Sequence, residues 1–496
     1  MRAASIARWV FGTFAALAAG LAGAGPRSMV SRALIVGGGP DLAHNQVSIE
    51  SNVRYVDRLL PRKAPRTVLY ADGDAKAKSV LAEVSAAPAS DDEKLLTMLL
   101  NGPGASAAPS TTYRAPEIGR IDGPSSTDAV TKAFAELRAQ KPSSGPLLLY
   151  FTGHGSMDKG GNLDNNVYDL WGGTGYSVQQ LAAEVAQLPA KQPVALVMVQ
   201  CFSGSFGNLL FQDGKPKGAP LERDIAGFFA SLPNLPAAGC TPEVNEADYH
   251  DFTSYFFAAL TGIDRLGRRT TGADANRDGR VGMDEAFCYA LINDKSIDVP
   301  VCTSDVFLRA NTTALDADLL ARPYRDALAW ATPAQAGALT ELSAQLKLDG
   351  DDRGTVAFAR YRDARSPAGM ARGGRWFRSL VLALRAAGND LKQGRPALAD
   401  RNSAGFQAAY ADALKAMPAE RAAGRYAAIE EALKANADAG RAGLDAEIQQ
   451  SRLLRFVRLF KTVVLTHDMV ENGDPALRAR FKRLIQSEQR TILPKA

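Results

Sequence analysis

Short apolar runs alternate with segments of helical period over roughly the first 300 residues. The runs are RALIVGGGP (32–40), RTVLYADGD (66–74), GPLLLYFTGHGS (145–156) and VALVMVQ (194–200). Each is rich in Val, Leu, Ile or Tyr and ends in glycine or polar residues, which is typical of a strand buried on both faces. Amphipathic segments such as SSTDAVTKAFAELRAQ and SVQQLAAEVAQLP lie between or after them. This alternation predicts an α/β fold, with a layered domain built on a mostly parallel sheet.

The pattern changes near residue 321, where strand-like runs stop and Ala, Arg, Leu and Glu recur in helical period. A chain of 496 residues is also too long for one ordinary core. We therefore expect an α/β domain over 25–321, followed by an α-helical C-terminal domain over 322–496. The basic and apolar segment 453–465 is typical of a core helix with solvated arginines more than of a membrane-surface helix.

The N-terminus has the order of a secretory signal peptide. Arginines precede an apolar stretch that is shorter than a membrane span, and Ala22-Gly23-Ala24 follows it. We expect residues 1–24 to be a leader, and the mature protein to be periplasmic or secreted, without a membrane span. The net charge of +5 is spread along the chain, which argues against a nucleic-acid partner.

Two chemically reactive residues follow two of the predicted strands. His154 comes directly after the run LLLYFTG, and Cys201 follows VALVMVQ after 47 further residues, with one amphipathic helix between them. This spacing fits one β-α-β crossover, which places both side chains at the carboxyl edge of the sheet. Gly155 could present its N–H to an oxyanion. A cysteine at a strand end is more often a packed small hydrophobe, but the pair together predicts nucleophilic catalysis.

The motifs YFTGHGS and VQCFSGSF resemble the legumain-like branch of the caspase-fold cysteine peptidases over residues 32–310. The resemblance implies a caspase-like fold and cleavage of a peptide or protein substrate. Cys201 would be the nucleophile, activated as a thiolate beside the imidazole, and His154 the general acid. The N–H groups of Gly155 and Cys201 would bind the oxyanion, and Asn45 would orient the histidine.

The sequence leaves several alternatives open. The family's Arg-His pair for acidic substrates is absent from HNQVSIESN, so asparagine or aspartate specificity does not follow from the resemblance. The same acyl-enzyme could pass to an amine, which would make the protein a transamidase or peptide ligase. A non-catalytic binding or scaffolding protein could also keep the fold. By analogy with legumains, the region after residue 321 could be a regulatory cap.

A second motif, DANRDGRVGMDE at 274–285, fits the calcium-loop pattern D-x-[DN]-x-[DN]-G-x5-E at every position. Hard oxygen ligands at this spacing suit calcium, while the alternative is a solvated turn before a helix. Since no good helix precedes the loop, we expect a structural calcium site formed by half an EF-hand. Its expected ligands are Asp274, Asn276, Asp278, Glu285 and the carbonyl oxygen of Arg280.

The remaining cysteines do not define a disulfide framework. With Cys201 reserved for chemistry, Cys240, Cys288 and Cys302 allow three single pairings, among which the sequence does not choose.

Overall fold

The fold is described from a computed structural model. The structure describes residues 28–83, 90–101, 111–364, 374–400 and 403–495. The predicted leader, residues 1–24, lies outside the described residues. The described chain divides into two compact units, each with its own core. Unit 1 consists of the described residues within 1–82, 113–361 and 451–496, and unit 2 of those within 83–112 and 362–450.

The strands and helices follow the predicted alternation along the first 300 residues. The strands are β1 Arg32–Gly38, β2 Arg66–Tyr70, β3 Val80–Glu83, β4 Thr111–Arg114, β5 Leu147–Gly153, β6 Gly155–Ser156, β7 Val167–Leu170, β8 Thr174–Ser177, β9 Val194–Met198, β10 Ile225–Phe229 and β11 Val301–Cys302. The α-helices are α2 Val47–Leu59, α3 Asp91–Asn101, α4 Thr127–Arg138, α5 Val178–Ala186, α6 Phe252–Thr261, α7 Met283–Asn293, α8 Thr303–Ala310, α9 Asp316–Leu320, α10 Tyr324–Trp330, α11 Pro333–Gln345, α12 Arg353–Ala364, α14 Gly374–Gly394, α15 Phe406–Ala422, α16 Ala427–Asn472 and α17 Pro475–Glu488. Short 3-10 helices are η1 Leu42–His44, η2 Leu163–Asn165, η3 Ser203–Leu210, η4 Gln212–Gly214, η5 Glu246–Asp248 and η6 Pro396–Ala399.

A six-stranded sheet forms the centre of unit 1, in the order β11-β10-β9-β5-β1-β2. All neighbours pair in parallel except β11, which runs antiparallel to β10. Strands β5 and β9 are buried at every position, as expected for parallel strands covered on both faces. The four strands read from the apolar runs are therefore confirmed, and so is the α/β class with a mostly parallel sheet.

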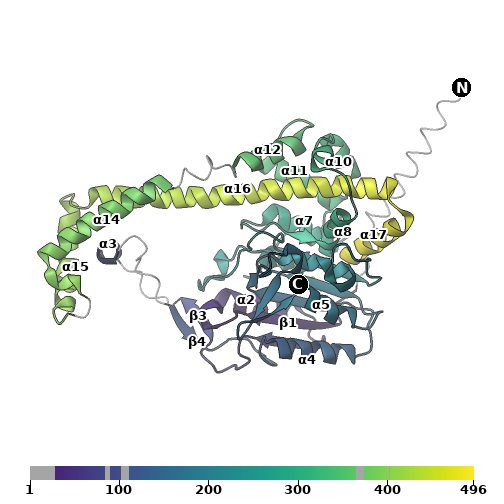
Figure 1. Cartoon of the computed structure of the whole chain (residues 1–496), viewed down its shortest axis with the longest axis horizontal. Helices are drawn as coiled ribbons and strands as arrows, with labels where there is room; N and C mark the ends of the chain where they lie inside the picture. Colours follow the sequence, from purple (N-terminus) through teal and green to yellow (C-terminus); the bar gives the residue numbers. More distant parts are fainter. Residues whose placement is uncertain (1–27, 84–89, 102–110, 365–373, 401–402, 496) are drawn as a thin grey trace. The chain divides into compact units, whose positions relative to one another are not determined.

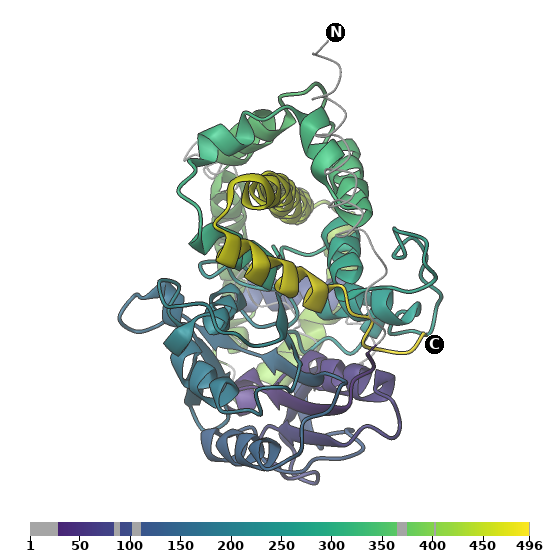
Figure 2. The same ribbon diagram turned by 90° about the vertical axis from the view of Figure 1, so that its right-hand side faces the viewer.

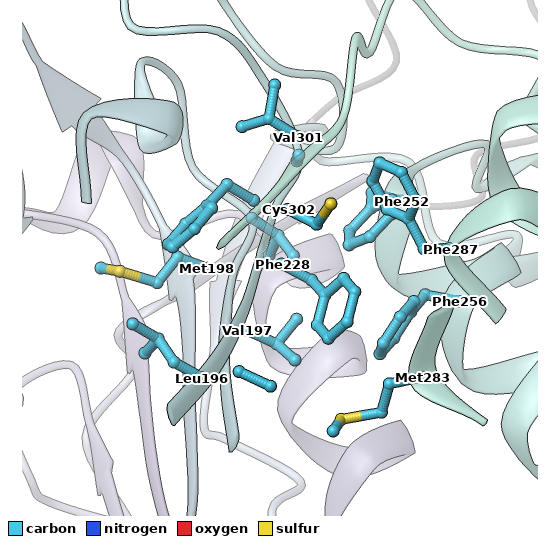
Figure 3. Packing of buried hydrophobic residues seen from close by; sticks show 14 of the residues in the cluster. Leu196, Val197, Met198, Phe228, Phe252, Phe256, Met283, Phe287, Val301 and Cys302 are labelled. Atoms are coloured by element: carbon cyan, nitrogen blue, oxygen red, sulfur yellow. The ribbon is translucent and has the colours of Figure 1, made fainter. Parts of the chain in front are cut away.

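Helices cover both faces of this sheet (Figure 1). On one face α4 and α5 pack together, and their side chains meet in an ion pair between Arg138 and Glu184. On the other face the hydroxyl groups of Tyr150 on β5 and Thr253 on α6 lie 2.9 Å apart. Figure 3 shows the aromatic packing beside it, where Phe228 of β10 meets Phe256 of α6 and Phe287 of α7.

The C-terminal end of the chain belongs to unit 1. Residues from 451 onward share its core, and the N–H groups of Ser28 and Val30 donate to the carbonyl oxygens of Thr491 and Ile492. Figure 2 looks along α16, whose C-terminal part lies inside the arc of α10–α12. Tyr324 of α10 stacks on Phe456 of α16 there.

The predicted boundary at residue 321 therefore differs from the division that the structure has. The helices between 322 and 361, and those after 450, bury their apolar faces in the core of the sheet domain instead of in a core of their own. Segment 453–465 is part of that core, since Phe456, Phe460 and Val463 are fully buried. Composition showed where along the chain the helical region begins, but it did not show against which hydrophobic core these helices pack.

Unit 2 has a separate apolar core formed by α3, α14, α15 and the N-terminal part of α16. Its buried residues include Leu96, Leu391, Met417 and Tyr426. The segments that build it are far apart in sequence, because α3 comes from an insertion between β3 and β4. Across the described residues of both units, every helix falls short of the length and apolar character that crossing a membrane requires.

Candidate active site

His154 and Cys201 follow two neighbouring strands, β5 and β9. These strands pair in parallel up to Phe151 opposite Met198, and each of the two residues comes three positions after that last pair. The pairing continues past the named strands, since the Val199 N–H donates to the Phe151 carbonyl oxygen at 3.0 Å. The carboxyl ends of parallel strands form one edge of a sheet. The structure thus places the two residues together at that edge, as the β-α-β spacing predicts.

Gly155 brings the two loops into direct contact. A Cβ atom at this position would clash with the carbonyl oxygen of Cys201 and would lie 2.6 Å from Cγ of Gln200. Only glycine allows the backbone after His154 to approach the cysteine this closely. Gln200 itself is buried, and within the described residues neither its Oε1 nor its Nε2 has a hydrogen-bond partner.

The N–H group of Gly155 is available at this contact. Gly155 on β6 pairs with Tyr168 on the antiparallel strand β7, and the Asp169 N–H donates to the His154 carbonyl oxygen at 3.0 Å. Hydrogen-bonded and non-hydrogen-bonded pairs alternate along an antiparallel ladder. Since His154 and Asp169 form a hydrogen-bonded pair, the next pair, Gly155 and Tyr168, is non-hydrogen-bonded, and the N–H groups of both residues point away from the partner strand. The predicted oxyanion donor is therefore not used up by the β6–β7 ladder.

The His154 ring is held by Gln46, the residue before α2. Nε2 of His154 lies 3.0 Å from Oε1 of Gln46. An amide oxygen only accepts, so in this orientation of the amide the Nε2 atom carries a ring proton. Burial, and then the neighbouring His44, lower the pKa of His154. The histidine is consequently neutral at physiological pH and able to accept a proton.

Asn45 does not orient the histidine, which corrects the expectation from the resemblance. Its Oδ1 accepts the Gly39 N–H at 3.1 Å and its Nδ2 donates to the Ser79 carbonyl oxygen at 2.8 Å. Asn45 is fully buried, and these bonds fix the loop after β1. The contact to the ring belongs to its neighbour Gln46, which the sequence reasoning missed although an amide one residue along was the available signal.

The Cys201 sulfur lies against the loop that follows β10. The Ala237 N–H donates to Sγ at 3.3 Å, and Sγ lies 3.7 Å from the Ala237 carbonyl oxygen. Burial raises the pKa of the Cys201 thiol, so the resting site holds a thiol. A thiolate stabilised by imidazolium, which the sequence predicts, is not the resting state of this arrangement. The next residue, Phe202, has a φ of 60°, a left-handed conformation that is uncommon outside glycine and that recurs at functional sites.

A second cysteine lies at the same place. Cys240 is exposed, and its Sγ is 3.6 Å from the carbonyl oxygen of Gly153, the residue before His154. Sequence reasoning did not find it, because no motif surrounds it. All four cysteines are free, with Cys288 and Cys302 buried, so none of the three possible pairings of Cys240, Cys288 and Cys302 is present.

The predicted calcium loop is closed by its own side chains. Asp274 accepts the N–H groups of Asp278 and Gly279, at 3.0 and 2.9 Å. Glu285 accepts those of Ala275 and Gly282, both at 3.0 Å. The loop thus curls around the carboxylates of Asp274 and Glu285, which are the first and last ligands of the calcium pattern. In this structure their oxygens accept backbone N–H groups of the loop. No group of three or more His, Cys, Asp or Glu side chains in the described part of the chain is arranged as a metal site.

No protein-family model and no curated protein matches the sequence.

Proposed function

We propose that the chain is an exported cysteine endopeptidase of the caspase-like fold, acting on peptide or protein substrates through Cys201 and His154. The observation that carries the proposal is that these two residues follow adjacent parallel strands, each three positions after the last paired residues. Two further features support it: the glycine contact between their loops, and the Gln46 amide that holds the histidine ring.

The first step joins the sulfur to the substrate carbonyl carbon. Since the resting cysteine is a thiol, its proton moves to Nδ1 of His154 as Sγ attacks. The carbonyl oxygen becomes an oxyanion, for which the Gly155 N–H is the available donor. The Nε2–H bond to Gln46 keeps the ring oriented while it carries the additional proton.

The second step breaks the peptide bond. The imidazolium of His154 donates its proton to the leaving amine, and the acyl group remains on Cys201 as a thioester. Water then attacks the thioester, with neutral His154 accepting its proton, and the thiol is regenerated. An amine that reaches the thioester before water would give a new amide, which is the transamidase outcome.

Three variants and a set of fluorogenic peptides test this proposal. Cys201→Ala and His154→Ala are expected to abolish turnover, while Cys240→Ala, a matched change at the neighbouring thiol, retains it. Adding hydroxylamine distinguishes hydrolysis, which yields an acid, from transfer, which yields a hydroxamate. Turnover that survives Cys201→Ala would refute the assignment of the nucleophile.

Calcium belongs to the same proposal as a structural ion. Asp274, Asn276, Asp278, Glu285 and the Arg280 carbonyl oxygen would hold it, and the ion would supply charge compensation for the loop carboxylates. The loop fits calcium in its oxygen donor set and in the sharp turn at Gly279, whose φ is 84°. To bind the ion, the Glu285 carboxylate would have to give up the hydrogen bonds that it accepts from backbone N–H groups of the loop.

Calcium that binds only the folded chain raises the melting temperature by mass action. We expect a higher midpoint in millimolar calcium than in EDTA, and loss of this difference in Asp274→Asn. Asp213→Asn, in a separate turn, is the control. Equal midpoints in calcium and EDTA would show that the loop is only a turn.

A further inference from the structure

One carboxylate lies directly opposite the proposed catalytic histidine. The antiparallel pairing of Gly155 with Tyr168 and of Ser156 with Val167 places Asp169 across from His154. Residues opposite one another on antiparallel strands project to the same face, with Cα atoms about 5.5 Å apart in a hydrogen-bonded pair. Asp169 therefore shares the face that carries the histidine side chain.

The Asp169 carboxylate has room for one more partner. Oδ1 accepts the Ser156 hydroxyl at 2.6 Å. Within the described residues no donor bonds to Oδ2, and Asp169 forms no ion pair. Some shielded carboxylates elsewhere in the chain have arginine partners, such as Glu50 with Arg114 and Asp305 with Arg309, whereas others, such as Glu285 and Glu488, accept N–H or O–H groups instead. Asp169 is half-buried without such a counter-ion.

The charged groups near His154 and Cys201 are mainly carboxylates. The groups that act most strongly on His154 and Cys201 are Asp41, Asp169, Asp298 and His44, with no lysine or arginine among them in the described part of the chain. Partial burial raises the pKa of Asp169, against the opposing effects of Ser156 and of His154 and His44. The site therefore presents a carboxylate that lacks a permanent cation.

We propose that Asp169 selects substrates that carry lysine or arginine immediately before the scissile bond. The inference rests on the proposed peptidase function. A guanidinium or ammonium group would supply the missing counter-ion, and a charge-assisted hydrogen bond to Oδ2 is about twice as strong as a neutral one. An aspartate at the same substrate position would instead place two carboxylates together.

Matched peptides test the charge preference in the full chain. The probes are Ala-Ala-Xaa aminomethylcoumarin amides in which Xaa is arginine or citrulline, its neutral isostere, with lysine and asparagine as a second pair. We expect kcat/KM to be at least about tenfold higher for arginine than for citrulline, which corresponds to one charge-assisted bond. The advantage should shrink at high salt, because the interaction is electrostatic.

Variants assign that preference to the carboxylate. Asp169→Asn should bring the arginine-to-citrulline ratio close to one, mainly by lowering kcat/KM for arginine, and Asp169→Glu should recover part of it. Glu136→Gln, which removes an exposed charge from α4, is the control and should leave the ratio unchanged.

The outcomes separate this inference from the function on which it rests. Equal cleavage of arginine and citrulline peptides overturns the inference and leaves a peptidase. An Asp169→Asn variant that loses the same factor on every peptide also overturns it, since the carboxylate would then act through His154 and not through substrate charge. Absence of any Cys201-dependent turnover refutes the peptidase proposal, and the inference with it.

Discussion

The buried carboxyl group of Glu488 connects the last helix of the chain to the sheet. Glu488 ends α17 and is only 2% exposed. Its Oε1 accepts the Thr303 hydroxyl at 2.7 Å and the Ser304 N–H at 2.6 Å. The Thr303 oxygen in turn accepts the Gly227 N–H of β10 at 3.0 Å. We predict that Glu488→Gln changes the pH dependence of stability, because the amide keeps the accepting oxygen and removes the titration.

The magnitude follows from the pKa of this group. Burial raises the pKa of Glu488 from 4.5 to about 7, against the opposing hydrogen bonds from Thr303 and Ser304. The folded state therefore holds a proton that the unfolded state releases above pH 4.5. This contribution is fully present below that pH and is lost as the pH rises through 7. A difference of 2.5 units corresponds to about 3 kcal/mol.

Guanidinium unfolding followed by circular dichroism, at half-unit steps from pH 5 to pH 8, measures this contribution. We expect wild type and Glu488→Gln to be similar near pH 5, and the variant to be more stable by up to about 3 kcal/mol at pH 8. Burial also raises the pKa of nearby Asp284, to about 8, and the Glu488 charge adds to that shift, so the difference between wild type and variant includes the coupling of the two carboxyl groups. Glu471→Gln, at an exposed position of α16, is the control. A difference between wild type and variant that stays constant with pH would refute the reasoning.

Four further predictions concern the site and the domain boundary. Gln46→Ala should lower kcat about ten- to a hundredfold with little change in KM, through loss of ring orientation. Its neighbour Asn45→Ala should instead lower stability by about 1–3 kcal/mol, measured by denaturant unfolding, because two buried hydrogen bonds are lost. By mass spectrometry, iodoacetamide should modify Cys201 in preference to Cys240, because burial raises the pKa of the Cys240 thiol well above its usual range, and a peptidyl chloromethyl ketone should modify Cys201 alone. A chain ending at residue 321 should lack a cooperative melting transition, and a folded product would restore the boundary read from composition.

The sheet was predictable because its strands are buried on both faces. Such strands become continuous runs of Val, Leu and Tyr, as in 147–151 and 194–198, and periodicity identifies them without tertiary information. The adjacency of His154 and Cys201 then followed from crossover geometry. The helical region after residue 321 was equally visible, but an amphipathic helix shows only that it has an apolar face and not what that face covers.

The residues that contact His154 and Cys201 were less predictable, since they depend on loop conformation. Gln46 and Asn45 are both amides in one loop, and only the backbone before α2 decides which reaches the His154 ring. Asp169 faces the histidine through a register of two short strands that no apolar run indicates. Cys240 lies in a loop, where the sequence has no periodic pattern of apolar residues that could indicate its position.

The C-terminal helices also support the site itself. Arg455 of α16 is fully buried, and its guanidinium donates to the carbonyl oxygens of Asp294, Ser296 and Asp298, at 2.7, 3.0 and 2.7 Å. The Asp298 carboxylate then accepts the N–H of Ala238 at 2.6 Å, next to the residue whose backbone contacts the Cys201 sulfur. A buried guanidinium is costly unless its donors are satisfied, so removal of either side leaves unpaired polar groups in the core. The loop that contacts the Cys201 sulfur therefore depends on a residue of α16, far along the chain, which ties this edge of the sheet and the C-terminal helices into one core.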